Sequence, residues 1–170
     1  MINFRKEVFK LKIRVMCREE CFAYAHGWGK EYDASIEDMS VPTMIISISS
    51  YDTPIPNILQ EDEKENPLIK HVEFCQFDDI DSPIPVQYFI PISEDDAKRI
   101  VDAVEKYKDE VEEIVVHCDA GYSRSPAVAA AISLWLNGTD DEFFNPLKYC
   151  PNRQVYRTVL KEIEKRGYFY

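Results

Sequence analysis

A cysteine and an arginine separated by five residues lie in the segment HCDAGYSRS, residues 117–125. This segment follows the apolar run 114–116 and precedes a run of small residues that begins at Pro126, so the pattern predicts a strand, a tight loop and a helix. Such a loop directs backbone N–H groups and the positive end of the helix dipole at one point, where a phosphate dianion can bind. Arg124 adds a planar fork of donors that matches two phosphate oxygens. The spacing therefore predicts attack by Cys118 on a phosphate ester.

The field that holds a phosphate also stabilises a thiolate, so we expect Cys118 to be ionised at neutral pH. Attack by this thiolate on phosphorus would give a covalent phosphocysteine and divide hydrolysis into two easier steps. The hydroxyl of Ser125 could donate to the thiolate and help it leave in the second step, and it could also cap the helix. This chemistry needs no cofactor. The pair Cys17 and Cys21 has no second pair to complete a zinc site, so we predict no metal site either.

Residues 116–128, VHCDAGYSRSPAV, resemble the signature loop of the cysteine-dependent protein tyrosine phosphatases, and the Ser-Arg-Ser-Pro ending resembles their dual-specificity branch. The resemblance covers about residues 70–165 and leaves residues 1–40 as a variable N-terminal part. It implies that His117 orients the loop through hydrogen bonds from behind. It also implies that Asn152, in a Pro-Asn pair, braces the loop, although a plain helix cap is an equal alternative. The residues that it implies for phosphate binding are Asp119, Ala120, Gly121, Tyr122, Ser123 and Arg124.

A tyrosine or serine leaving group needs a proton from a general acid. The resemblance implies that this acid lies in a loop just upstream of the helix that precedes the signature strand, where the chain carries Asp78, Asp79 and Asp81. Asp79 is the first candidate because Pro83 follows it by four residues, as in some relatives; Asp78 is the second and Asp81 the third. The 39 residues from Asp79 to Cys118 are somewhat many for the dual-specificity branch. The three aspartates could also form only a turn.

Other segments must form the sheet that positions the loop. Alternating or β-rich apolar runs predict strands over residues 9–15, 43–49, 71–77 and 114–118, the first with its basic side chains on the solvent face. Helices are predicted over 19–25, from the capping box at Ser93 to about 108, after the loop to Asn137, and after Asn152. Prolines and acidic residues predict a loop over 52–67. Together these elements predict one α/β domain over residues 1–170, with a short, mostly parallel central sheet flanked by helices on both faces.

The charge of the chain narrows the substrate classes. A net charge of −11 argues against nucleic acid or an anionic membrane surface as a partner. No variable position of the loop is cationic, and Asp119 should repel polyphosphorylated ligands. We therefore expect a phosphorylated protein as substrate, with phosphotyrosine first and phosphoserine or phosphothreonine next. The alternatives are an RNA 5′ end, an inositol phosphate, or a phosphoprotein-binding module with little turnover.

The five cysteines predict a reducing compartment. No signal-peptide core or membrane-spanning run is found, so we expect reduced thiols and a cytoplasmic location. A monomer is the default expectation. Under oxidation, Cys75 or Cys150 could form a protective disulfide with Cys118.

Overall fold

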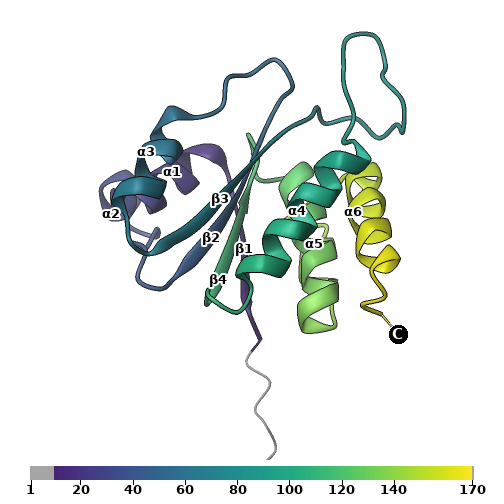
Figure 1. Cartoon of the computed structure of the whole chain (residues 1–170). Helices are drawn as coiled ribbons and strands as arrows, with labels where there is room; N and C mark the ends of the chain where they lie inside the picture. The colour runs from purple at the N-terminus through teal and green to yellow at the C-terminus, as the bar shows by residue number, and fades with distance from the viewer. Residues whose placement is uncertain (1–9, 170) are drawn as a thin grey trace, which may run out of the picture.

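The structure is a computed structural model that describes residues 10–169. At its centre is a sheet of four strands in the order β1-β4-β2-β3 (Figure 1). The strands are β1 (Lys12–Met16), β2 (Thr43–Ser49), β3 (Ile69–Gln76) and β4 (Glu113–His117). All three strand pairs are parallel. The predicted α/β class is thus confirmed.

Helices form a layer on each side of this sheet (Figure 1). One side carries α1 (Arg18–His26), α2 (Gly29–Tyr32) and α3 (Asn57–Glu65). The other carries α4 (Glu94–Tyr107), α5 (Arg124–Asn137) and α6 (Arg153–Lys165), with a short 3₁₀ helix, η1 (Asp141–Phe144), against α5. Along β2, Met44 and Ile46 belong to the core beneath α4–α6, and Ile45 belongs to the opposite core. Successive side chains of a strand point to opposite faces, so burial on both faces explains the apolar run of β2.

The carboxyl ends of the four strands supply the polar groups of one site. Arg18, Ser50, Phe77 and Cys118 each follow a different strand by one or two residues. Parallel strands end at the same edge of a sheet, and binding sites of such sheets lie at that edge. The strand order places β4, which leads into Cys118, between β1 and β2. The fold therefore brings segments far apart in the sequence to the loop after β4.

The prediction of a loop over residues 52–67 is wrong, because this stretch contains α3. The prolines lie outside the helix: Pro54 and Pro56 precede it, and Pro67 follows its end. A proline is tolerated before the first turn of a helix, so none of the three prevents one from forming. Leu59 is fully buried in the core beneath α1 and α3. This apolar contact stabilises a helix whose outer face is acidic.

The prediction that the first strand turns its basic residues to solvent holds for the exposed Lys10 and Lys12, but Arg14 is partly buried. Arg14 Nη1 lies 3.2 Å and Lys12 Nζ 3.1 Å from Oε1 of Glu113, a carboxylate that is fully buried on β4. Tyr24 donates its hydroxyl to the other oxygen of Glu113, at 2.5 Å. A buried carboxylate needs charged and hydrogen-bonding partners. Pairing with Glu113 thus holds Arg14 beside Tyr24 of α1, while Lys12 reaches Glu113 from an exposed position. Phe9, also assigned to the strand, lies outside the described residues.

Candidate active site

Cys118 follows β4 directly and is buried, with 2% of its surface exposed. Its Sγ lies 3.1 Å from Oγ of Ser125, which is fully buried in the first turn of α5. The Ser125 hydroxyl is thus placed to donate to the sulfur when the sulfur is a thiolate. The N-terminus of α5, a helix of 14 residues, also favours negative charge at this point. The geometry suits a cysteine that acts as an anionic nucleophile.

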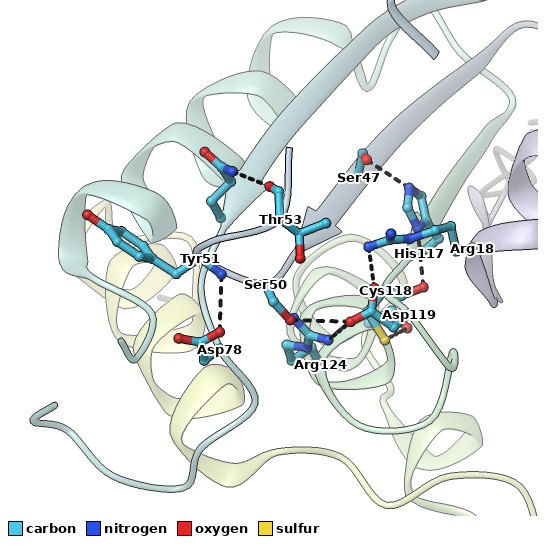
Figure 2. A network of polar contacts seen from close by, with 12 residues as sticks. Arg18, Ser47, Ser50, Tyr51, Thr53, Asp78, His117, Cys118, Asp119 and Arg124 are labelled. Atoms are coloured by element: carbon cyan, nitrogen blue, oxygen red, sulfur yellow. Dashed lines mark hydrogen bonds and ion pairs between the residues drawn. The ribbon is translucent and has the colours of Figure 1, made fainter. Parts of the chain in front are cut away.

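Three protein contacts fix the guanidinium of Arg124, which is the first residue of α5; Figure 2 shows two of the partners, Ser50 and Asp119. Nη1 donates to the carbonyl of Phe77 at 3.0 Å and to Oγ of Ser50 at 3.3 Å. Nη2 donates to Oδ2 of Asp119 at 2.6 Å. Nε is buried and has no acceptor among residues 10–169. Nε and Nη2 share one edge of the guanidinium, so the edge that binds two oxygens of an oxyanion is the one the protein leaves for a ligand.

Arg124→Lys should lower kcat/KM for p-nitrophenyl phosphate by about 10²–10³-fold, the scale of losing an oriented oxyanion donor. An ammonium keeps the charge, but it cannot bond to Phe77 and Asp119 and still present two parallel N–H groups. Steady-state rates measured beside Arg99→Lys, a change at the distant contact between α4 and β3, would check this. Near-normal turnover with lysine would show that position 124 contributes only charge.

Gly121 lets the loop lie against the junction of β1 and α1. Its φ is +66°, and a Cβ at this position would come within 2.8 Å of the Met16 carbonyl and the Cys17 nitrogen. Only glycine combines that conformation with so close an approach. The other side of the loop meets the segment before α6, where the Cys150 N–H donates to the Tyr122 carbonyl at 2.9 Å. The loop of residues 118–124, called the phosphate loop below, is thus held from both sides. The side chains of Ala120 and Tyr122 lie at the surface.

His117 lies behind the loop and is fully buried. Burial lowers the pKa of His117 from 6.5 to about 4, so the ring is neutral at pH 7. Nε2 lies 2.8 Å from Oγ of Ser47, and Nδ1 lies 3.3 Å from the Cys118 carbonyl (Figure 2). A neutral ring can accept from the serine and donate to the carbonyl. The structure therefore places His117 where it can orient the loop, away from the proton transfers.

The depressed pKa of His117 predicts a loss of stability in acid. In the unfolded chain the His117 ring takes up a proton below pH 6.5, whereas in the folded chain it does so only near pH 4. The neutral ring's contribution to folding stability is therefore complete above pH 6.5 and is lost as pH falls. Between pH 7 and pH 5 the protonation of His117 should lower the free energy of unfolding by about 2 kcal/mol, since each pKa unit corresponds to about 1.4 kcal/mol. Urea unfolding at both pH values should show this excess loss relative to His117→Gln. Equal losses in the two proteins would contradict it.

Asp79 connects the segment after β3 to the phosphate loop. Its Oδ1 accepts from Oγ of Ser123 at 2.7 Å and from Nδ2 of Asn152 at 2.8 Å. Asn152 also caps α6, since its Oδ1 accepts from the Val155 N–H at 3.0 Å, and its own N–H donates to the Ser123 carbonyl at 3.0 Å. Asn152 therefore contacts the loop and caps the helix at once. The exposed carboxyl of Asp79 lies at the rim of the loop, where a leaving group would depart.

The other two aspartates are bound to backbone elsewhere. Asp78 is buried, and its carboxylate accepts from the Ile90 N–H at 2.7 Å and from the Tyr51 N–H at 3.1 Å. The contact with Ile90 thus closes the base of the segment between β3 and α4, and the contact with Tyr51 joins this segment to the one after β2. Asp81 accepts from the Gln154 N–H at 3.0 Å, at the start of α6. Of the three candidates, the structure brings Asp79 to the loop and gives the other two structural contacts.

Neither family models nor curated protein sequences match the chain. Among solved structures, human DUSP28 aligns with a TM-score of 0.52 at 13% identity, over 93% of this chain and 95% of that one. PTPMT1 aligns with a TM-score of 0.51 at 14% identity, over 95% of this chain and 98% of that one. The fold is that of the dual-specificity phosphatases. At such low sequence identity the structural similarity establishes only the arrangement of helices and strands. The proposed chemistry is therefore argued from the geometry of the site.

Asp119 does not make the loop of this dual-specificity phosphatase fold acidic. Its Oδ2 pairs with Arg124 and its Oδ1 with Arg18, so two cations face one carboxylate. Partial burial opposes ionisation, but the hydrogen bond and charge of Arg124, together with Arg18 and Ser50, lower the pKa of Asp119. The three charged groups carry a net charge of +1. The expectation that Asp119 repels polyphosphorylated ligands therefore loses its physical basis.

Sequence analysis missed Arg18, Ser50 and the Phe77 carbonyl. All three are polar groups just beyond the carboxyl end of a strand, and that position was the available signal. The conformation of Arg124 depends on the last two groups, and that of Asp119 depends on Arg18. None of the three belongs to the signature segment.

All five cysteines are free thiols. Cys75 is buried in β3, and this burial raises the pKa of its thiol. Cys150 is exposed, and its backbone contacts the phosphate loop through Tyr122. A disulfide of either with Cys118 stays a prediction. Within residues 10–169, no group of three or more His, Cys, Asp or Glu side chains is arranged to hold a metal ion, and no helix combines the length and apolarity to span a bilayer.

Proposed function

We propose that the chain is a phosphomonoester hydrolase that acts through a phosphocysteine intermediate. The observation that carries the proposal is the open edge of Arg124, whose buried Nε lacks an acceptor among the described residues. Nη1 is engaged by Phe77 and Ser50, and Nη2 donates once, to Asp119, so the guanidinium is fixed before a ligand arrives. Binding alone would not need a buried cysteine next to a serine hydroxyl. The pairing of Cys118 with Ser125 therefore favours turnover over a binding module.

The reaction has two steps. In the first, the Cys118 thiolate forms a bond to phosphorus while the bond between phosphorus and the ester oxygen breaks, and Asp79 gives that oxygen a proton. In the second, water attacks phosphorus, Asp79 takes its proton, and the S–P bond breaks to release inorganic phosphate. The Ser125 hydroxyl stabilises the departing thiolate. Arg124 and the loop bind the equatorial oxygens throughout.

Phosphotyrosine in proteins is the substrate class that we favour. Cys118 is buried, whereas the residue at the outer side of the loop, Tyr122, is half exposed. An aryl phosphate can reach from such a rim to the sulfur, and its ring can pack against that of Tyr122. Phosphoserine and phosphothreonine are shorter, and we place them second within this protein-phosphatase function.

An inositol phosphate is the second candidate. It is favoured by the pairing of Asp119 with two arginines, which leaves this part of the loop with a net positive charge. PTPMT1, whose structure in complex with PI(5)P aligns with a TM-score of 0.50 over 94% of each chain at 12% identity, shares the fold. The two candidates differ in whether a second phosphate is bound.

Release of inorganic phosphate tests the proposal. The substrates are p-nitrophenyl phosphate, matched peptides with phosphotyrosine, phosphoserine or phosphothreonine, PI(5)P, a soluble inositol phosphate and 5′-triphosphate RNA, all with EDTA present. We expect turnover of the aryl phosphate and of the phosphotyrosine peptide, and we expect rapid quenching to trap phosphate on Cys118. Faster turnover of PI(5)P than of the phosphotyrosine peptide would favour the second candidate, an inositol phosphate, as the substrate. Tungstate binding without turnover of any substrate would establish a binding module and overturn the proposal.

A further inference from the structure

Arg18, Asp119 and Arg124 form a chain of charges beside the phosphate loop (Figure 2). Nη2 of Arg124 lies 2.6 Å from Oδ2 of Asp119, and Nη2 of Arg18 is paired with Oδ1 of the same carboxylate. The backbone N–H of Arg18 also donates to the Asp119 carbonyl, at 3.1 Å. Arg18 therefore holds Asp119 by both its main chain and its side chain.

The carboxylate of Asp119 is held by three groups: Arg124 and the Ser50 hydroxyl, at 3.3 Å, contact Oδ2, and Arg18 alone contacts Oδ1. Its side chain is 45% exposed, whereas that of Arg124 is 5% exposed. A carboxylate at the surface can exchange a protein partner for water at little cost. Because Arg18 occupies Oδ1, the carboxylate stays turned so that Oδ2 faces Arg124. Asp119 and Arg124 alone would have no net charge. Arg18 adds a second cation, so the three groups together are positive, which favours the binding of a dianion.

We propose that Arg18 is a positioning residue: through Asp119 it fixes the guanidinium of Arg124 with its oxyanion-binding edge toward the loop. The inference deepens the proposed phosphatase function and rests on it. It gives the β1–α1 junction, which lies outside the signature segment, a role in the reaction. Asp119 lies between the two arginines, so Arg18 acts on the substrate through another side chain.

The test compares four variants with the wild type: Arg18→Gln, Arg18→Lys, Asp119→Asn and the double change Arg18→Gln with Asp119→Asn. Arg99→Gln is the matched control, since Arg99 also pairs with a carboxylate, that of Glu73, and donates to a backbone carbonyl, but far from the loop. Calorimetry gives the Kd for tungstate, an oxyanion that mimics phosphate. Steady-state assays with p-nitrophenyl phosphate give kcat and KM, and thermal unfolding gives Tm.

We expect Arg18→Gln to weaken tungstate binding and to lower kcat, each about tenfold, while Arg99→Gln changes neither. Arg18→Lys should restore part of both. The double variant should be no worse than Asp119→Asn alone, because residues that act as one unit do not add. A lower Tm for Arg18→Gln with unchanged Kd and kcat would mean a merely structural role and overturn the inference.

Multiplying effects in the double variant would also overturn it, because they would mean that Arg18 contacts the oxyanion independently. A different result would contradict the proposed phosphatase function: a wild type that binds tungstate but releases no phosphate. In that case the tungstate Kd values of the variants still decide the role of Arg18.

Discussion

Cys118→Ser is expected to lower kcat for p-nitrophenyl phosphate by about 10⁵-fold or more, the scale found when a covalent nucleophile is removed. A serine hydroxyl stays protonated in a site that stabilises a thiolate, so the first step loses its nucleophile. The loop, Arg124 and the N-terminus of α5 are unchanged. Tungstate should therefore bind at least as tightly as to the wild type, because the repulsion from a thiolate is gone. Rates and tungstate affinity measured on the same preparation check both halves of the prediction.

Cys150→Ser is the matched control, since Cys150 is an exposed thiol whose contact with the loop is a backbone hydrogen bond that the substitution retains. This variant should turn over normally. Iodoacetate should inactivate the wild type, and tungstate should protect, because both compete for the loop around Cys118. Substantial turnover by Cys118→Ser would remove the phosphocysteine from the mechanism. Inactivation that tungstate does not slow would contradict the placement of the Cys118 sulfur in the oxyanion site.

The nucleophile and its loop could be predicted because their determinants are local. The strand, the loop and the helix around Cys118 are adjacent in the sequence, and Arg124 reaches the phosphate from the same segment. The class of the fold followed from the periodicity of the apolar runs, as the exact match of β2 to residues 43–49 illustrates. Helix α3 is not predicted because prolines and acidic residues indicate a loop unless the position of the prolines relative to the helix ends is known. All three lie beyond the ends of the helix.

The support of the loop could not be predicted in the same way. Arg18 and Asp119 are 101 residues apart, and their contact exists because β1 lies beside β4 in the sheet. Strand order depends on the packing of the whole domain, and a short alternating run does not encode it. The charge around Asp119 depends on the same strand order, because Arg18 is one of its two cationic partners. An acidic residue in a loop is repulsive only if nothing far along the chain neutralises it.

The choice among the three aspartates shows where local information ends. In the sequence all three lie in one acidic turn, and only the spacing to a single proline ranks them. The structure separates them by their partners, since Asp78 closes the base of its own segment and Asp81 bonds to the start of α6. Asp79 meets Ser123 and Asn152, which are 44 and 73 residues away. These contacts make Asp79 the carboxyl group nearest to the proposed chemistry among the three, and they allow a sharper test.

Asp79→Asn is expected to slow phenyl phosphate by about 10²–10⁴-fold, the range for a positioned general acid. It should slow p-nitrophenyl phosphate much less, because nitrophenolate departs without a proton. An asparagine can still accept from Ser123 and Asn152, which keeps the loop contacts and isolates the proton transfer.

Asp78→Asn and Asp81→Asn are the comparisons that make this result specific. Asp78→Asn should lower Tm, because the amide nitrogen of asparagine cannot accept the backbone N–H that one of the two carboxylate oxygens of Asp78 accepts. Neither comparison variant should change the ratio of rates for the two substrates. If that ratio changes in Asp78→Asn and not in Asp79→Asn, Asp78 is the acid, and the segment after β3 must rearrange when substrate binds. If it changes in none of the three, the proton comes from outside this turn, and the contact of Asp79 with the loop serves only to hold the two segments together.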